Sequence, residues 1–244
     1  MTPDSQAAID RFVDAVWLED GLSANTLAAY RRDLSALADW LQQSTGTPLD
    51  AVQESHLQAY FAARHSLSKA TSANRRLTVF KRYYRWALRE RIVQVDPTLR
   101  MLAAKQALRV PKTLSEDQVD ALLSAPDANT PLGLRDKAML ELLYASGLRV
   151  SELVKLKTLH VSLNEGVLRI MGKGSKERLV PFGDMARDSL LNYMQNARGA
   201  LLGSKQTDDL FVTASGPKAG TAMSRIMFWS LIKKYAVIAG ITAP

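Results

Sequence analysis

The chain has 244 residues, of which 47% are hydrophobic and 23% charged, a composition typical of a globular protein with room for two modest domains. It contains no cysteine and only three widely spaced histidines, so disulfide scaffolds and thiolate metal sites are excluded and no zinc site is expected. No run approaches the roughly 18 apolar residues of a membrane span, and the N-terminus lacks the features of a signal peptide. We therefore expect a cytoplasmic protein without a membrane partner.

The net charge of +8 is concentrated in one segment. Residues 64–112 carry thirteen Lys and Arg side chains against two acids, Glu90 and Asp96. Such an excess is typical of a protein that binds a polyanion, of which nucleic acid is the commonest. The alternative is a basic helix face that is only solvated.

In chain order, the first predicted helix begins near Leu27, where apolar residues recur at helical spacing. A longer helix is predicted over about 71–91. Its inward stripe is formed by Leu77, Phe80, Tyr84 and Leu88. Four arginines fall within an arc of roughly 80° away from that stripe, at about 100° per residue. These candidate DNA-binding residues are Arg75, Arg82, Arg85 and Arg89. The aromatic residues of the helix are expected in the core, namely Phe80, Tyr83, Tyr84 and Trp86.

Asp96-Pro97 is expected to end the helical domain, because proline cannot continue a helix. We assign residues 1–102 to an N-terminal domain, 103–113 to a basic linker and 114–244 to a second domain. The second domain begins at Ser115, which forms a capping box with Gln118.

Further helices are predicted over about 134–145, from Arg149 to Lys155, over 185–198 and over 224–239, the last closed by Gly240. Between them, residues 167–171 and 177–180 have the pattern of two strands joined as a hairpin.

Two short motifs suggest a chemistry. In ASGLRVSEL (145–153), Arg149 follows a helix break at Ser146-Gly147, where the next helix could offer unpaired N–H groups to an anion. In GKGSKER (172–178), Lys173 lies between two glycines. This is no P-loop, since valine occupies position 167 and glycine follows the lysine. Taken alone, Lys173 would be an exposed lysine in an ordinary hairpin.

The two motifs at this interval, with the flanking text LRDKAMLELLYASGLRVSEL and FWSLIKKYAVIAGI, resemble tyrosine recombinases, in particular the XerD branch of the bacterial XerC/XerD recombinases. The resemblance implies a mainly α protein, with a helical, SAM-like core-binding domain and a mostly helical catalytic domain that holds a small antiparallel β-sheet. It further implies that Arg149 holds the scissile phosphate, that Lys173 is the general acid for the departing 5′-oxygen, and that neither metal nor cofactor takes part. Glu152 is expected to support Arg149.

The resemblance also implies a double-stranded recombination site, a XerC-like recombinase in a tetrameric synaptic complex and a DNA translocase as activator, in the resolution of chromosome dimers. The family's His-x-x-Arg motif and its nucleophilic tyrosine fall beyond the equivalent of Pro244, so the catalytic domain is expected to be incomplete and the chain unable to cleave DNA. Tyr144 and Tyr235 lie in apolar helices and are expected in the core, not as substitutes. The alternatives are a non-catalytic DNA-binding accessory module, or an inactive fragment of a recombinase. A transcription regulator would leave Lys173 unexplained.

Overall fold

The computed structural model describes residues 1–105, 113–172 and 176–242. The chain divides into two compact units, Met1–Val110 and Pro111–Pro244, which are described separately below. Of the expected linker, residues 103–105 and 113 belong to the described part.

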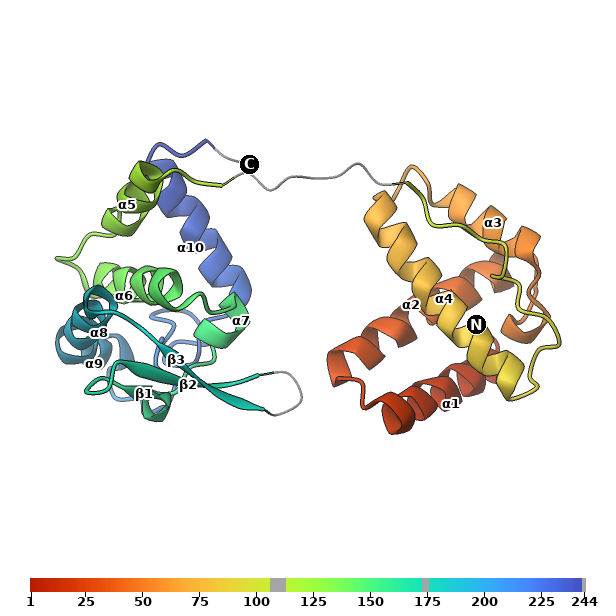
Figure 1. Cartoon of the computed structure of the whole chain (residues 1–244), viewed down its shortest axis with the longest axis horizontal. Coiled ribbons are helices and arrows are strands. Elements are labelled where there is room, and N and C mark those ends of the chain that lie inside the picture. Colours follow the sequence, from red (N-terminus) through yellow and green to blue (C-terminus); the bar gives the residue numbers. More distant parts are fainter. Residues whose placement is uncertain (106–112, 173–175, 243–244) are drawn as a thin grey trace. The chain divides into compact units, whose positions relative to one another are not determined.

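All the regular secondary structure in the described part of the first unit is helical (Figure 1). Its elements are α1 (Pro3–Asp20), α2 (Ala24–Ser44), the 3-10 helix η1 (Leu49–Ala51), α3 (Glu54–Ala63) and α4 (Ala70–Arg89). The starts of α1 and α2 follow from local chemistry, because the hydroxyls of Thr2 and Ser23 accept hydrogen bonds from backbone N–H groups of the first turn. Gly21 ends α1 with a φ of 58°, a left-handed conformation that glycine adopts without strain.

Helix α4 packs its aromatic side against α1 and α2, and its predicted aromatic residues are buried as expected. The rings of Phe80, Tyr83 and Tyr84 are fully covered. The prediction for Leu88 is wrong, because its side chain is 42% exposed. The large rings, and Trp86 and Ala87 beside them, decide which side of α4 faces inward and turn Leu88 toward solvent.

The chain after α4 returns along the same helix. Asn74 of α4 holds the backbone of Ala104 by two hydrogen bonds, which are 2.9 Å from its Nδ2 to the carbonyl and 2.8 Å from the Ala104 N–H to its Oδ1. Met101 packs against the core of the unit. The first residues of the expected linker are therefore attached to the N-terminal unit.

The second unit combines helices with a small sheet (Figure 1). Its helices are α5 (Glu116–Ser124), α6 (Pro131–Ser146), α7 (Val150–Leu153), the 3-10 helix η2 (Thr158–His160), α8 (Asp184–Asn196), α9 (Arg198–Leu202) and α10 (Arg225–Ile238). Its strands are β1 (Val161–Ser162), β2 (Val167–Met171) and β3 (Glu177–Pro181), antiparallel in the order β1-β2-β3.

Most of the helix ends predicted for this unit are confirmed. Ser115 and Gln118 form the expected capping box, and Gly240 follows α10 with a φ of 69°. Two details differ. The helix after Arg149 ends at Leu153 and not at Lys155, and the helix expected over 185–198 breaks at Ala197 into α8 and α9. Strand β1 was not predicted, because two residues are too short to show a period.

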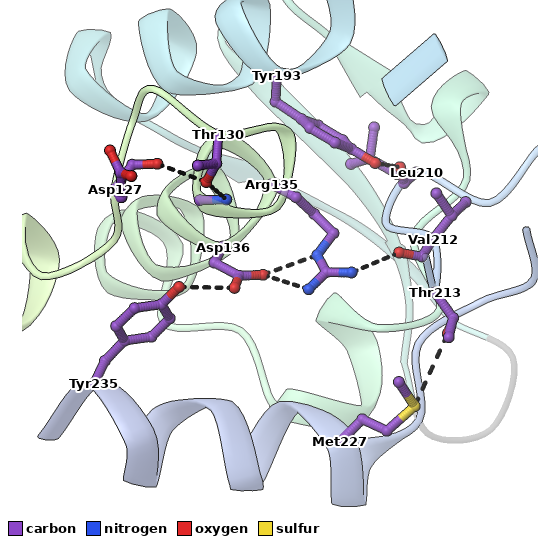
Figure 2. Close-up of polar contacts among 11 residues, drawn as sticks. Asp127, Thr130, Arg135, Asp136, Tyr193, Leu210, Val212, Thr213, Met227 and Tyr235 are labelled. Atoms are coloured by element: carbon purple, nitrogen blue, oxygen red, sulfur yellow. Dashed lines mark hydrogen bonds and ion pairs between the residues drawn. The ribbon is translucent and has the colours of Figure 1, made fainter. Parts of the chain in front are cut away.

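A buried polar network holds the central helix α6 to its neighbours (Figure 2). Arg135 donates from Nε and Nη2 to Asp136 Oδ1 at 2.8 and 2.6 Å, and from Nη1 to the carbonyl of Val212 at 2.9 Å. The other oxygen of Asp136 accepts the hydroxyl of Tyr235 on α10 at 2.9 Å. Burial raises the pKa of Asp136, although Arg135 and Tyr235 both act to lower it.

Candidate functional site

Arg149 is presented by a glycine turn. Helix α6 ends at Ser146, and Gly147 adopts a φ of 59° while its N–H donates to the carbonyl of Leu143 at 3.0 Å. Leu148 is buried, and Arg149 becomes the N-cap of α7. Its side chain is 75% exposed, so most of the guanidinium faces solvent. The turn thus places a permanent positive charge where a ligand can reach it.

Glu152 fixes Arg149 at both its backbone and its side chain. One carboxylate oxygen accepts the Arg149 N–H at 2.9 Å, and the other accepts Nη1 at 3.1 Å. This N–H is therefore not available to an anion, because an internal carboxylate already accepts it. Glu152 also accepts Nη2 of Arg178, on β3, at 3.0 Å.

Glu152 is ionised at neutral pH. Its side chain is 12% exposed. Burial acts to raise its pKa, but the hydrogen bonds from Arg178 and Arg149 together outweigh burial and hold the pKa below its ordinary value. Glu152 therefore supports two arginines and does not carry a proton. Sequence reasoning missed Arg178, because nothing local indicates a contact with a residue 26 positions away.

The β2–β3 hairpin projects beyond the helices (Figure 1). Its strands pair from Val167 opposite Pro181 to Met171 opposite Glu177, and the Gly172 N–H donates to the Lys176 carbonyl at 2.7 Å. Lys173 lies outside the described residues. Arg178 is paired with Ile170, one pair before the hairpin turn, so the Glu152–Arg178 contact joins the turn end of this hairpin to the turn that carries Arg149.

An open pocket of about 700 Å³ lies beside Arg149. It is lined by Val150 of α7 and by residues at the start of α10, namely Ser224, Arg225, Ile226, Trp229 and Ile232. Arg225 is exposed at its rim. The described residues contain no group of three or more side chains suited to hold a metal ion.

The four arginines predicted on one face of α4 do share that face, but three of them are paired with carboxylates. Arg82 pairs with Asp20 and Arg89 with Glu19, both at the end of α1, while Arg75 pairs with Asp33 of α2. Arg85 is exposed, and none of the ion pairs found among the described residues includes it. These acids are 42 to 70 positions away along the chain, so the sequence pattern of α4 gave no sign of them.

The tyrosines of the chain differ in how far they are buried. Five of the seven are buried, namely Tyr60, Tyr83, Tyr84, Tyr193 and Tyr235. The prediction for Tyr235 is confirmed, but that for Tyr144 is wrong, because its side chain is 65% exposed in the last turn of α6. The apolar residues of α6 do not gather on one face, so its sequence could not indicate which positions would be covered. Burial raises the pKa of all five buried hydroxyls, that of Tyr193 to about 12.

No helix of the described residues is long and apolar enough to cross a membrane.

The two units match two parts of one protein family. A model described as "Phage integrase family" matches residues 112–244, and one described as "Phage integrase, N-terminal SAM-like domain" matches residues 9–91. The chain is 58% identical to "Tyrosine recombinase XerD" of Ralstonia nicotianae, over all of this chain and 78% of that protein. It is 49% identical to the protein of the same name from Proteus mirabilis, over 98% of this chain and 75% of that one.

Solved structures show the same fold. A lambda integrase tetramer bound to a Holliday junction has a TM-score of 0.72 at 18% identity, over 97% of this chain and 64% of that chain. A lambda integrase (75-356) dimer bound to a COC' core site has a TM-score of 0.71 at 17% identity, over 97% and 79% of the two chains.

Proposed function

Because the chain belongs to the phage integrase family and is a XerD-like tyrosine recombinase that acts in site-specific recombination, we propose that Arg149 and Lys173 are its phosphate-binding and proton-donating residues. The observation that carries the first assignment is the exposed guanidinium of Arg149, held from one side by the ionised Glu152. One Nη contacts Glu152, so the outer N–H groups are free to meet a ligand in a fixed orientation.

A phosphodiester suits this arrangement. Strand cleavage places extra negative charge on the non-bridging oxygens of the scissile phosphate, and a positioned guanidinium stabilises that charge with two parallel hydrogen bonds. An arginine is charged at every physiological pH, so it serves without any proton transfer. We assign this role to Arg149, with Glu152 and Arg178 as the residues that position it.

We propose Lys173 as the general acid. Attack of a tyrosine oxygen on phosphorus breaks the bond to the 5′-oxygen, which then takes a proton from the lysine ammonium. In a form of the protein that carries the nucleophile, Lys173→Ala should slow cleavage, and a bridging 5′-sulfur should restore the rate because a thiolate leaves without a proton. Lys176→Ala, in the same hairpin, is the control and should show no such dependence. A Lys173→Ala defect that sulfur does not relieve would contradict the assignment.

We further propose that the 244 residues bind DNA but do not form a covalent bond to it. The family's nucleophile is a tyrosine, and five of the seven present here are buried with raised pKa values. The activity of the chain would then be that of a DNA-binding part of a recombinase, acting in the cytoplasm on a chromosomal recombination site. Strand exchange would need a XerC-like partner in a tetramer, with a DNA translocase as activator, in the resolution of chromosome dimers.

DNA binding is assigned mainly to residues 1–102, joined through residues 103–113 to a catalytic domain over 114–244. The support is the arginine face of α4, where Arg85 is exposed and is in no ion pair found among the described residues, and where Arg75, Arg82 and Arg89 lie on the same side. Arginines on an exposed helix face can contact both phosphates and guanine edges.

Replacing Arg82, Arg85 and Arg89 together with alanine should weaken DNA binding. It should also flatten the dependence of affinity on salt by roughly 0.9 in log–log slope for each phosphate that the protein no longer neutralises, because fewer counterions are then released. Fluorescence anisotropy over a range of salt concentrations measures both effects. A variant lacking Arg11, Arg32 and Lys218 removes the same charge elsewhere and should keep a steeper slope. Equal slopes in the two variants would show that the α4 face is only solvated.

A further inference from the structure

Helix α1 ends on two consecutive acids, Glu19 and Asp20, with no basic residue in its last turn. The C-terminal end of a helix carries partial negative charge, so carboxylates there oppose the helix dipole. Glu19 and Asp20 therefore do not stabilise α1 through the helix dipole. Both side chains instead contact arginines of α4.

The contacts take up the N–H groups that a phosphate would use. The two oxygens of Glu19 accept Nη2 and Nη1 of Arg89 at 2.6 and 3.0 Å, a bidentate pair of the kind that guanidinium also forms with phosphate. Asp20 accepts Nη2 of Arg82, whose Nη1 contacts the hydroxyl of Tyr30 at 3.3 Å. Arg89 has a second acidic neighbour, Glu90, 3.1 Å from its Nε.

These pairs are exposed, and exposed ion pairs contribute little to folding stability. The side chains of Glu19 and Asp20 are 48% and 42% exposed, and those of Arg89 and Arg82 are 53% and 34% exposed. The Arg75–Asp33 pair is different, because the Asp33 side chain is only 9% exposed and depends on its partner. Glu19 and Asp20 can therefore release their arginines without loss of the fold.

We propose that Glu19 and Asp20 compete with DNA phosphates for Arg89 and Arg82, and thereby lower the affinity of the protein for nonspecific duplex DNA. Phosphates that approach α4 must displace a preformed carboxylate from two arginines, whereas Arg85 is exposed and has no carboxylate partner among the described residues. A nonspecific duplex offers only phosphate contacts, so nothing offsets the free energy needed to break these two ion pairs. A recombination site adds base contacts that offset it. The inference rests on the proposed DNA-binding role of α4.

The test uses the whole chain and a duplex of random sequence. Glu19→Gln with Asp20→Asn should tighten binding by on the order of tenfold at low salt, since each exposed pair opposes binding by at most about fivefold. The salt dependence should become steeper, by up to roughly 0.9 in slope for each arginine that now engages a phosphate fully.

The matched control is Asp4→Asn with Asp14→Asn. Both residues are exposed on α1, neither is in an ion pair found among the described residues, and the pair removes the same charge. It should give only the smaller increase expected from net charge. Thermal unfolding of both variants checks that the fold is kept. In a background of Arg82→Ala and Arg89→Ala, the gain from Glu19→Gln with Asp20→Asn should fall to the smaller increase that the control pair gives.

The outcomes distinguish the competition by Glu19 and Asp20 from the DNA-binding role of the α4 arginines. An equal gain in both charge-matched variants, or a gain that keeps its full size without Arg82 and Arg89, would overturn the competition. If the two arginine substitutions weaken binding but removal of the acids changes nothing, the competition also fails while the DNA-binding face stands. If the arginine substitutions leave binding unchanged, the proposed role of these arginines on α4 is itself wrong.

Discussion

Glu152 has partners from two elements, Arg149 before α7 and Arg178 on β3. A single carboxylate thus links the turn that presents the candidate phosphate-binding arginine to the hairpin that carries Lys173. Its hydrogen bonds favour the charged form, so Glu152 contributes stability above its ordinary pKa of 4.5, and this contribution disappears as the pH falls through its lowered folded-state pKa.

Glu152→Gln should therefore destabilise the second unit in a pH-dependent way. At neutral pH we expect a loss on the order of 1 kcal/mol, because the three hydrogen bonds that Glu152 accepts lose their charged acceptor and the amide NH2 of glutamine cannot accept any of them. The difference from wild type should shrink as the pH falls from 4.5 through the lowered folded-state pKa, below which the wild-type carboxylate is protonated as well. Urea unfolding across this range measures it, with the exposed Glu165→Gln as control. A difference that is constant with pH would mean that Glu152 acts through shape alone.

At the scale of elements, α10 is held to α6 by a buried polar contact. The Tyr235 hydroxyl donates to Asp136, whose other oxygen is held by Arg135 (Figure 2). The start of α10 lines the pocket beside Arg149, so the network sets one wall of the candidate site through the position of the whole helix.

Tyr235→Phe should destabilise the second unit by about 1–3 kcal/mol, since it leaves a buried carboxylate oxygen without its donor. The midpoint of urea unfolding provides the measurement. Tyr144→Phe removes the same atom from an exposed position and should stay within about 0.5 kcal/mol of wild type. Equal effects of the two substitutions would show that the Asp136 contact does not hold α10.

For the whole molecule, the two units have separate cores. The apolar cluster of the first unit runs from Ala8 to Val93, and that of the second from Ala138 to Tyr235. The tyrosines follow this division, because burial in one core or the other accounts for five of them. Tyr144 alone is largely exposed, while Tyr30 packs against the first core.

The chain of 244 residues should therefore form no covalent complex with a nicked suicide substrate, although it binds the same DNA. A denaturing gel reports the covalent bond, and a native gel with the same sample confirms binding. A buried hydroxyl with a raised pKa can neither reach a phosphate nor lose its proton readily. An adduct mapped by mass spectrometry to any of the seven tyrosines, Tyr144 first among them, would contradict this expectation.

The sequence by itself determined what depends on neighbours along the chain. The capping box at Ser115, the helix break at Gly147 and the two strands of the glycine hairpin follow from residues close together in the sequence, and the structure has each of them. The same local motifs were sufficient to indicate the family. The fold class followed with it.

Only the tertiary structure decided which charges and rings meet. Arg89 and Glu19 are 70 positions apart, and Arg178 lies 26 positions after Glu152, so no local period indicates either pair. Leu88 and Tyr144 were misplaced for the same reason, since exposure depends on what packs against a helix and not on the helix alone. Side-chain pairing over such separations is set by how the helices and strands pack against one another. For this reason most arginines on the exposed face of α4 are paired with carboxylates, although the sequence of α4 alone indicates an unpaired basic face.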